Sequence, residues 1–428
     1  MTTSTRNDFE EGKLNDESSG SIGEFKSIMN LALTAVGVGV LALPVAIAQS
    51  GYGIGILLLL VTWALTQSMM HLLFRCMETS RRSGSSKINS YAAIGEVAYG
   101  KIGKCAVAFS MYLGLSAICV ILIQLTGMCL SQLTGTLTLS RWILISALCI
   151  VPLSLIPSMK EIGILSFIGV VAVLIVCVAV LVVAIAIDPA ERGPIQATPI
   201  SFSGFSIGFL EFMNGFTVAP VIPSIILSMR NPDRYPRVAA MGFALIALVF
   251  AIVGFGGYMA FGEDVLSYGL ITVGMSKKAY AIGSSVYATV CQVSIIIVCL
   301  AHFVVMFNPI AQLSDSVFTD TRPITTVFKM LARASIVGFM LIPAIFIPHF
   351  GVVVDLVAAT VVLPLQVIMP ILFYAKICRD DIRRLTHTKR YFLYSAFSVS
   401  VVICIAAMVY GLYKTIVNWP KRSLTLSI

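Results

Sequence analysis

The chain has 428 residues, of which 58% are hydrophobic and 11% charged, and its formal net charge is +9. About a quarter of an ordinary soluble domain is charged, so this composition excludes one. The apolar residues come in runs of about 20, long enough for a helix to cross about 30 Å of hydrocarbon. Because lipid cannot satisfy backbone hydrogen bonds, such runs have to be helical. The sequence predicts an all-α polytopic membrane protein.

The chain begins with a polar tail, residues 1–25, whose mixed charges are typical of disorder. This tail has no apolar core and is not a cleavable signal peptide, so the first spanning helix would direct insertion. The pair Asn308-Pro309 predicts the end of the eighth helix. In all, eleven apolar runs follow the tail, at about 27–48, 52–75, 103–131, 142–158, 162–187, 205–228, 236–261, 279–306, 325–347, 350–376 and 391–417.

The basic residues indicate how the chain crosses the membrane. If the tail is cytoplasmic, 22 of the 29 Lys and Arg residues fall on the inner side, as expected for short cytoplasmic loops. The positive charge therefore needs no nucleic-acid partner, and a short tail, 418–428, lies outside. A lipid-binding role for the basic segment 376–390 stays open. No address signal is readable, so the plasma membrane and a lysosome- or vacuole-like membrane are both candidates.

The sequence gives no sign of an enzyme. It contains no HExxH, no GxSxG and no cluster of Cys and His residues. The ten cysteines lie mostly within apolar runs and are interpreted as small buried hydrophobic residues. We expect no catalytic residue, metal or cofactor. An amino-acid receptor with little flux remains a rival interpretation, whereas nothing indicates the selectivity filter of a channel.

Two segments differ from the ordinary Leu/Ile/Val spans. Residues 37–44 read Gly-Val-Gly-Val-Leu-Ala-Leu-Pro, and residues 214–220 read Asn-Gly-Phe-Thr-Val-Ala-Pro. Gly and Pro weaken helix interiors, and interruptions at matching places in two halves point to a midplane substrate site. Each break exposes helix ends that can hold a carboxylate, an amine or an ion. The predicted substrate-binding residues are Thr34, Gly37, Val38, Gly39, Val40, Glu211, Asn214, Gly215 and Phe216.

These segments resemble a known family. Residues 30–44 resemble the first helix of the amino acid/auxin permeases. Residues 257–262 resemble the Gly-Tyr-x-x-Phe-Gly motif that ends the seventh helix of that family. Residues 228–232 are similar to their inner loop after helix 6, although Ser228 replaces an acidic residue of many members. The tenth helix, with Pro364 and Pro370, is also similar, and the likeness extends from about 25 to 415.

The resemblance implies a LeuT-type fold with two inverted five-helix repeats and one extra helix. The repeats would be residues 26–187 and 205–376, followed by helix 11 at 391–417. It also implies transport of amino acids. Our main hypothesis is alternating access, in which helices 1 and 6 with their partners rock against a scaffold of helices 3, 4, 8 and 9. Sodium-coupled members often have Asn where this chain has Leu33, which favours a coupling proton over sodium; uncoupled transport also remains open.

Glu211 is the candidate for coupling. An acidic residue deep in a spanning helix is costly unless it is paired or hydrated, so it indicates a function by default. It could carry the coupling proton or balance the charge of a cationic amino acid. Hydroxyls of the eighth helix, at Ser284, Ser285 and Thr289, are candidate ion ligands, although such hydroxyls also bond back to their own helix.

Overall fold

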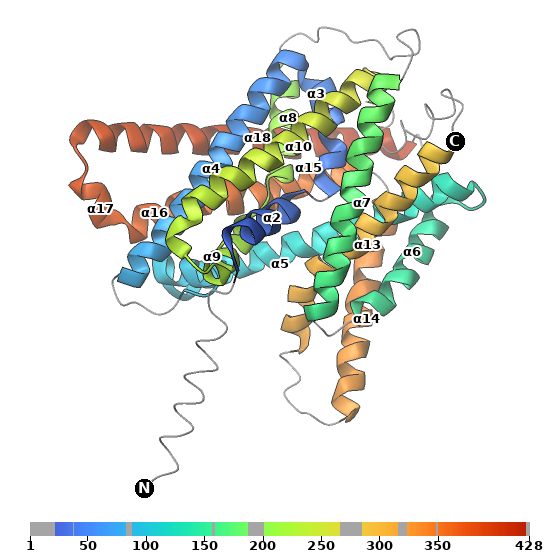
Figure 1. Ribbon diagram of the computed structural model, residues 1–428, viewed down its shortest axis with the longest axis horizontal. Helices are drawn as coiled ribbons and strands as arrows, with labels where there is room; N and C mark the ends of the chain where they lie inside the picture. Colours follow the sequence, from blue (N-terminus) through green and yellow to red (C-terminus); the bar gives the residue numbers. More distant parts are fainter. Residues whose placement is uncertain are drawn as a thin grey trace.

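Figure 1 shows the computed structural model as a bundle of long helices in which both halves of the chain are interleaved. The structure describes residues 22–36, 38–82, 88–155, 159–186, 201–265, 285–315, 323–347 and 350–424. The first half contains α2 (Glu24–Ala35), η1 (Val38–Ala42), α3 (Leu43–Ser50), α4 (Tyr52–Arg82), α5 (Tyr91–Thr134), α6 (Leu139–Ser154) and α7 (Met159–Ala186). The second half contains α8 (Phe202–Gly215), η3 (Ala219–Val221), α9 (Ile222–Ser228), η4 (Pro232–Arg234), α10 (Tyr235–Phe261), α13 (Ser285–Asp315), α14 (Pro323–Phe346), α15 (Phe350–Val357), η5 (Ala358–Val362), η6 (Pro364–Ile368), α16 (Met369–Ile377), α17 (Arg379–Arg384) and α18 (His387–Leu424).

The number of membrane segments agrees with the sequence. Within the described ranges, nine helical stretches are long and apolar enough to span a membrane. Two shorter apolar helices, Gly39–Ser50 and Leu139–Ser154, stand in the two remaining places. With α2 preceding the first of these, the prediction of about eleven spanning segments is confirmed.

Some hydroxyl groups inside the bundle bond back to their own helix, and large apolar side chains lie on its outer surface. The hydroxyl of Thr62 donates to Leu58 O at 2.6 Å, and that of Ser50 donates to Ala46 O at 2.8 Å. Such back-bonds remove an unpaired donor without a partner helix. On α14, Phe339 and Phe346 are 74% and 76% exposed. Large apolar side chains on the outside suit contact with lipid tails.

The third segment begins earlier than the predicted 103. α5 starts at Tyr91 but is bent at Tyr99 and Gly100, where Gly100 has φ of +63°. The arms on either side of this bend are joined by an ion pair, 2.9 Å between Lys104 Nζ and Glu96 Oε2. The apolar spanning part therefore follows the bend, close to the predicted boundary, and a short helix precedes it.

The predicted end of the eighth helix is wrong. α13 continues through Asn308 and Pro309 to Asp315. A proline removes one helical hydrogen bond, but neighbouring helices can hold the turns around it. Beyond it, Arg333 of α14 donates to Asp315 Oδ2 at 2.6 Å and to Ser154 O of α6 at 3.2 Å. These contacts tie the last turns of α13 to two neighbouring helices.

Candidate functional site

The first and sixth segments are both interrupted, and their interruptions face each other. α2 ends at Ala35 and η1 begins at Val38, whereas α8 ends at Gly215 and η3 begins at Ala219. A Cβ added to Gly39 would lie 3.3 Å from Gly215 Cα. The absence of a side chain at Gly39 thus allows the two backbones to approach closely. The two breaks, which the sequence predicts at matching positions in the two halves, therefore lie side by side in the structure.

An aromatic pair supports the sixth-segment break from behind. The rings of Phe216 and Phe250, the latter on α10, have centroids 4.8 Å apart. A Cβ on Gly215 would lie 2.7 Å from Phe250 Cε2, closer than real contacts allow. Phe216 is itself fully buried. This side chain therefore packs within the bundle and gives the break a rigid support.

Gln366 satisfies the backbone of the same break. Its Oε1 accepts hydrogen bonds from the amides of Val218 and Ala219, at 3.3 and 3.1 Å. Its Nε2 donates to Phe216 O at 2.8 Å. Gln366 lies in η6, a π-helical stretch that begins at Pro364, and is fully buried. The sequence patterns did not single it out, although an amide in an apolar helix needs a partner in lipid and is a signal that could have indicated it.

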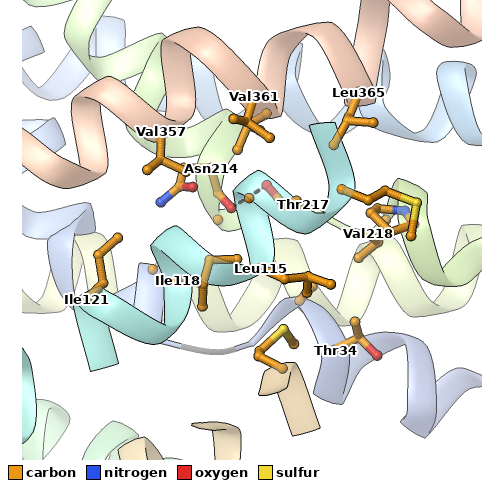
Figure 2. Close-up of a pocket in the computed structure, with 18 of the residues that line it drawn as sticks. Thr34, Leu115, Ile118, Ile121, Asn214, Thr217, Val218, Val357, Val361 and Leu365 are labelled. Carbon is orange, nitrogen blue, oxygen red and sulfur yellow. Dashed lines mark hydrogen bonds between the residues drawn. The ribbon is translucent and has the colours of Figure 1, made fainter. Parts of the chain in front are cut away.

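A cavity of about 110 Å³ lies beside the two breaks. Figure 2 shows Val357, Val361 and Leu365 along one side, with Ile118 of α5 across from them. These side chains form an apolar wall. Polar lining groups come from other elements, namely Thr34 of α2, Asn214 of α8, Thr217, and His302 of α13.

Two of these polar groups are available to a ligand. Thr34 Oγ1 donates to Asn30 O at 2.8 Å, and Thr217 Oγ1 donates to Asn214 O at 2.7 Å. By contrast, no hydrogen bond joins the Asn214 amide or the His302 imidazole to another side chain or backbone group in the described parts of the chain. An amide and an imidazole each offer both donors and acceptors.

Eight of the nine predicted substrate-binding residues fall into three groups, and the ninth, Glu211, is described below. Thr34, Gly39, Asn214 and Gly215 line the cavity. Val40 and Phe216 are buried and are not among its lining residues. Gly37 and the side chain of Val38 lie outside the described residues. The lining residues that the sequence did not predict come mainly from α5 and from the tenth segment.

Glu211 lies in a different environment from Asn214. It is 6% exposed, and it is absent from the described cavity lining. The charged groups nearest to it are Asp355 of α15, within hydrogen-bonding reach, and Lys414 of α18. At this junction Gly411 allows α18 to approach α8 closely. Glu211 thus belongs to a polar junction of three helices and not to the cavity wall.

Of the predicted hydroxyl ligands of the eighth segment, Thr289 lies far from the cavity. Ser284 is outside the described residues, and Ser285 is the first residue of α13. Thr289 is exposed and precedes His302 by about 20 Å along the helix axis at about 1.5 Å a residue. The α13 side chains at the level of the breaks are those of His302 and Met306.

Comparisons with known proteins identify related transporters. In sequence, the chain is similar to three amino acid transporters of Arabidopsis thaliana. AVT1H is 26% identical over 331 residues, which cover 75% of this chain and 74% of that protein. AVT3C is 24% identical over 380 residues, or 84% of each chain. AVT1D is 24% identical over 322 residues, or 73% of this chain, and this chain spans 56% of the length of AVT1D.

Two solved transporters have the same fold at low sequence identity. Mhp1 in an inward-facing conformation aligns with a TM-score of 0.58 and 12% identity, covering 95% of this chain and 92% of Mhp1. A Na⁺-coupled sialic acid symporter in a substrate-bound outward-open state aligns with a TM-score of 0.54 and 13% identity. The two alignments cover nearly whole chains, 93% of this one and 90% of the other in the second case. The LeuT-type fold is thereby confirmed.

The family described as transmembrane amino acid transporter protein matches residues 20–417. This range includes both helix breaks, the cavity and Gln366. The match covers most of the sequence, and the fold and the relatives agree with it. The chain therefore belongs to the transmembrane amino acid transporter family.

Proposed function

We propose that this protein is a secondary active transporter that carries amino acids by alternating access. The observation that supports this most is the meeting of the two helix breaks at Gly39 and Gly215 beside a cavity. Interrupted helices at the same depth in two repeats are typical of midplane substrate sites. The repeats would be residues 26–187 and 205–376, with the amino-terminal tail in the cytoplasm.

The polar part of the substrate would bind at the breaks. Amide and imidazole groups of Asn214 and His302 can donate to an α-carboxylate or accept from an α-amino group. The end of α2 and the start of η1 add backbone groups near Gly39. Hydrogen bonds to a charged group contribute about 1.5–3 kcal/mol each, enough to orient the substrate.

The substrate side chain would be neutral and apolar. Aliphatic side chains, among them Ile118, Val357 and Val361, form the wall, and no charged side chain is found in the described lining. A cationic side chain would lose its hydration there without gaining a partner. Glu211, the candidate to balance such a charge, lies outside the lining. Small and medium aliphatic amino acids fit this wall best.

A proton is the coupling ion that this geometry favours. Glu211 is buried, and the half-buried Asp355 brings a second carboxyl group within hydrogen-bonding reach of it. Two carboxyl groups placed side by side can share one proton. Sodium prefers several oxygen ligands, as hard cations do. At the level of the breaks, the α13 groups in the described lining are an imidazole and a thioether. We assign the coupling proton to Glu211, and sodium-driven or uncoupled transport is the alternative.

Uptake into proteoliposomes tests the proposal. A panel of labelled neutral, cationic and anionic amino acids would be offered first with an inward proton gradient and then with an inward sodium gradient. We expect saturable accumulation of neutral aliphatic amino acids that collapses with a protonophore. Accumulation driven by sodium alone would contradict the proton assignment. Binding without flux under every gradient would contradict transport and favour a receptor.

A further inference from the structure

A second and larger cavity adjoins the substrate cavity. It has a volume of about 390 Å³ and lies among α2, α7, α10 and α13. Val170 and Val173 of α7 and Val249 of α10 belong to its wall. The segments that enclose it are therefore distinct from the tenth segment, which forms the apolar wall of the smaller cavity.

The two cavities share three lining residues. Thr34, His302 and Met306 appear in the lining of both, so these side chains form the partition between them. Thr34 is held by its hydrogen bond to Asn30 O. Met306 is unbranched and flexible, and His302 has no hydrogen bond to another described residue. Of the three, the last two can change rotamer without breaking a hydrogen bond in the described chain.

The chemistry of this partition suits the passage of an amino acid. A zwitterion that leaves the breaks loses its polar contacts at the partition, before it reaches the larger cavity, whose lining includes the polar Asn30. Such desolvation costs several kcal/mol unless a hydrogen-bonding group travels with the charge. His302 offers a donor that can turn towards either cavity. The neutral imidazole carries one N–H and one acceptor nitrogen.

We infer that the larger cavity is an aqueous vestibule of the substrate cavity and that His302 is the gating residue between them. As the partition opens, the imidazole N–H remains hydrogen-bonded to the α-carboxylate of a neutral amino acid while Met306 swings aside. The role of His302 as a gate rests on the proposed transport function. The existence of the vestibule does not, because access of water to the larger cavity can be measured without any transport.

The chain carries its own probe of the vestibule. Cys177 of α7 lines the larger cavity and is 9% exposed, whereas Cys149 of α6 is exposed on a spanning helix. The full-length protein in liposomes would be treated with a charged methanethiosulfonate ethylammonium reagent and, separately, with uncharged N-ethylmaleimide. Modification of each cysteine would be followed by mass spectrometry over time, with and without millimolar L-leucine.

We expect the charged reagent to modify Cys177 and L-leucine to slow this reaction about fivefold or more. Cys149 should react with the uncharged reagent only, because its surroundings are lipid. Modification of Cys177 by the uncharged reagent alone would overturn the inference, since the cavity would then open to lipid. Modification that L-leucine does not slow would overturn it as well. Slowed modification in a protein without flux would support the vestibule and contradict transport.

Variants at His302 test the gate. We expect His302→Ala to lower the maximal uptake rate about tenfold, while the charged reagent, which reaches Cys177 through the larger cavity itself, should modify Cys177 at an unchanged rate. His302→Gln keeps an N–H donor and should retain at least half of the rate. Met306→Leu is the matched control, because it keeps the volume of the partition and should change either readout by less than twofold. Wild-type uptake in His302→Ala would overturn the role of the imidazole.

Discussion

The two helix breaks look alike in the sequence but differ in how their backbone groups are satisfied. At the sixth-segment break, Gln366 takes up Phe216 O and the amides of Val218 and Ala219. At the first-segment break, no side chain of another helix donates to or accepts from Val36, Gly39 or Val40 in the described chain. In the described chain one break is closed by a partner within the protein, and we propose that the other binds the substrate.

This difference in hydrogen bonding suggests different roles for the two breaks. A backbone group that is already bonded in the bundle has little to gain from a substrate, because the bond must first be exchanged. On the proposed function, the closed sixth-segment break would be a rigid support for the side chain of Asn214. The first-segment break would bind the substrate through its own backbone. Substitutions at each break should have correspondingly different effects.

The largest effect is expected for Gln366→Leu. This change keeps the approximate volume but leaves three buried backbone groups unpaired, and each costs about 1–3 kcal/mol. We expect uptake to fall at least about a hundredfold and the unfolding temperature of the detergent-solubilised protein to fall with it. Initial uptake rates and thermal unfolding would be measured together.

Gln366→Glu is the matched control for this prediction. A carboxylate keeps the acceptor for Val218 and Ala219 but loses the donor to Phe216 O. Uptake should fall between those of Gln366→Leu and the unchanged protein. Equal uptake in all three proteins would show that the sixth-segment break does not depend on η6.

The next effect contrasts the two glycines. In Gly215→Ala the new methyl would meet Phe250 Cε2 at 2.7 Å, whereas in Gly39→Ala it would lie 3.3 Å from Gly215 Cα. Overpacking a tight core costs about 1–3 kcal/mol, so we expect at least about a tenfold loss of uptake for Gly215→Ala and a smaller loss for Gly39→Ala. Phe250→Leu should partly restore Gly215→Ala. A larger loss for Gly39→Ala would reverse the roles assigned to the two breaks.

Sequence patterns predicted the breaks because Gly and Pro act locally. They could not predict which break is closed, since Gln366 lies about 150 residues further along the chain. They also placed Glu211 with Asn214, because residues three apart share one side of a helix. At 3.6 residues a turn the two still differ by about 60°. The close approach of α18 at Gly411, a tertiary contact, decides that Glu211 faces a different set of helices.

A moderate effect on substrate affinity is expected for Asn214→Ala. Removal of one hydrogen bond to a charged substrate group costs about 1.5–3 kcal/mol, so the KM should rise at least about tenfold while the maximal rate changes less. Thr217→Val is the control, because that hydroxyl already donates to Asn214 O. Concentration-dependent uptake separates KM from the maximal rate. An equal rise in KM for both variants would argue against a direct contact of Asn214.

Glu211→Gln is expected to have the smallest effect on the rate of substrate exchange. It should nevertheless abolish the coupling of transport to the proton gradient. Because Glu211 lies outside the cavity lining, exchange of labelled for unlabelled amino acid should stay within about twofold. Accumulation driven by a proton gradient should disappear, since a Gln amide cannot take up and release the coupling proton. Counterflow and gradient-driven uptake in the same proteoliposomes measure the two properties. Proton-driven accumulation that survives in Glu211→Gln would move the coupling site elsewhere, and a large loss of exchange would place Glu211 in contact with the substrate after all.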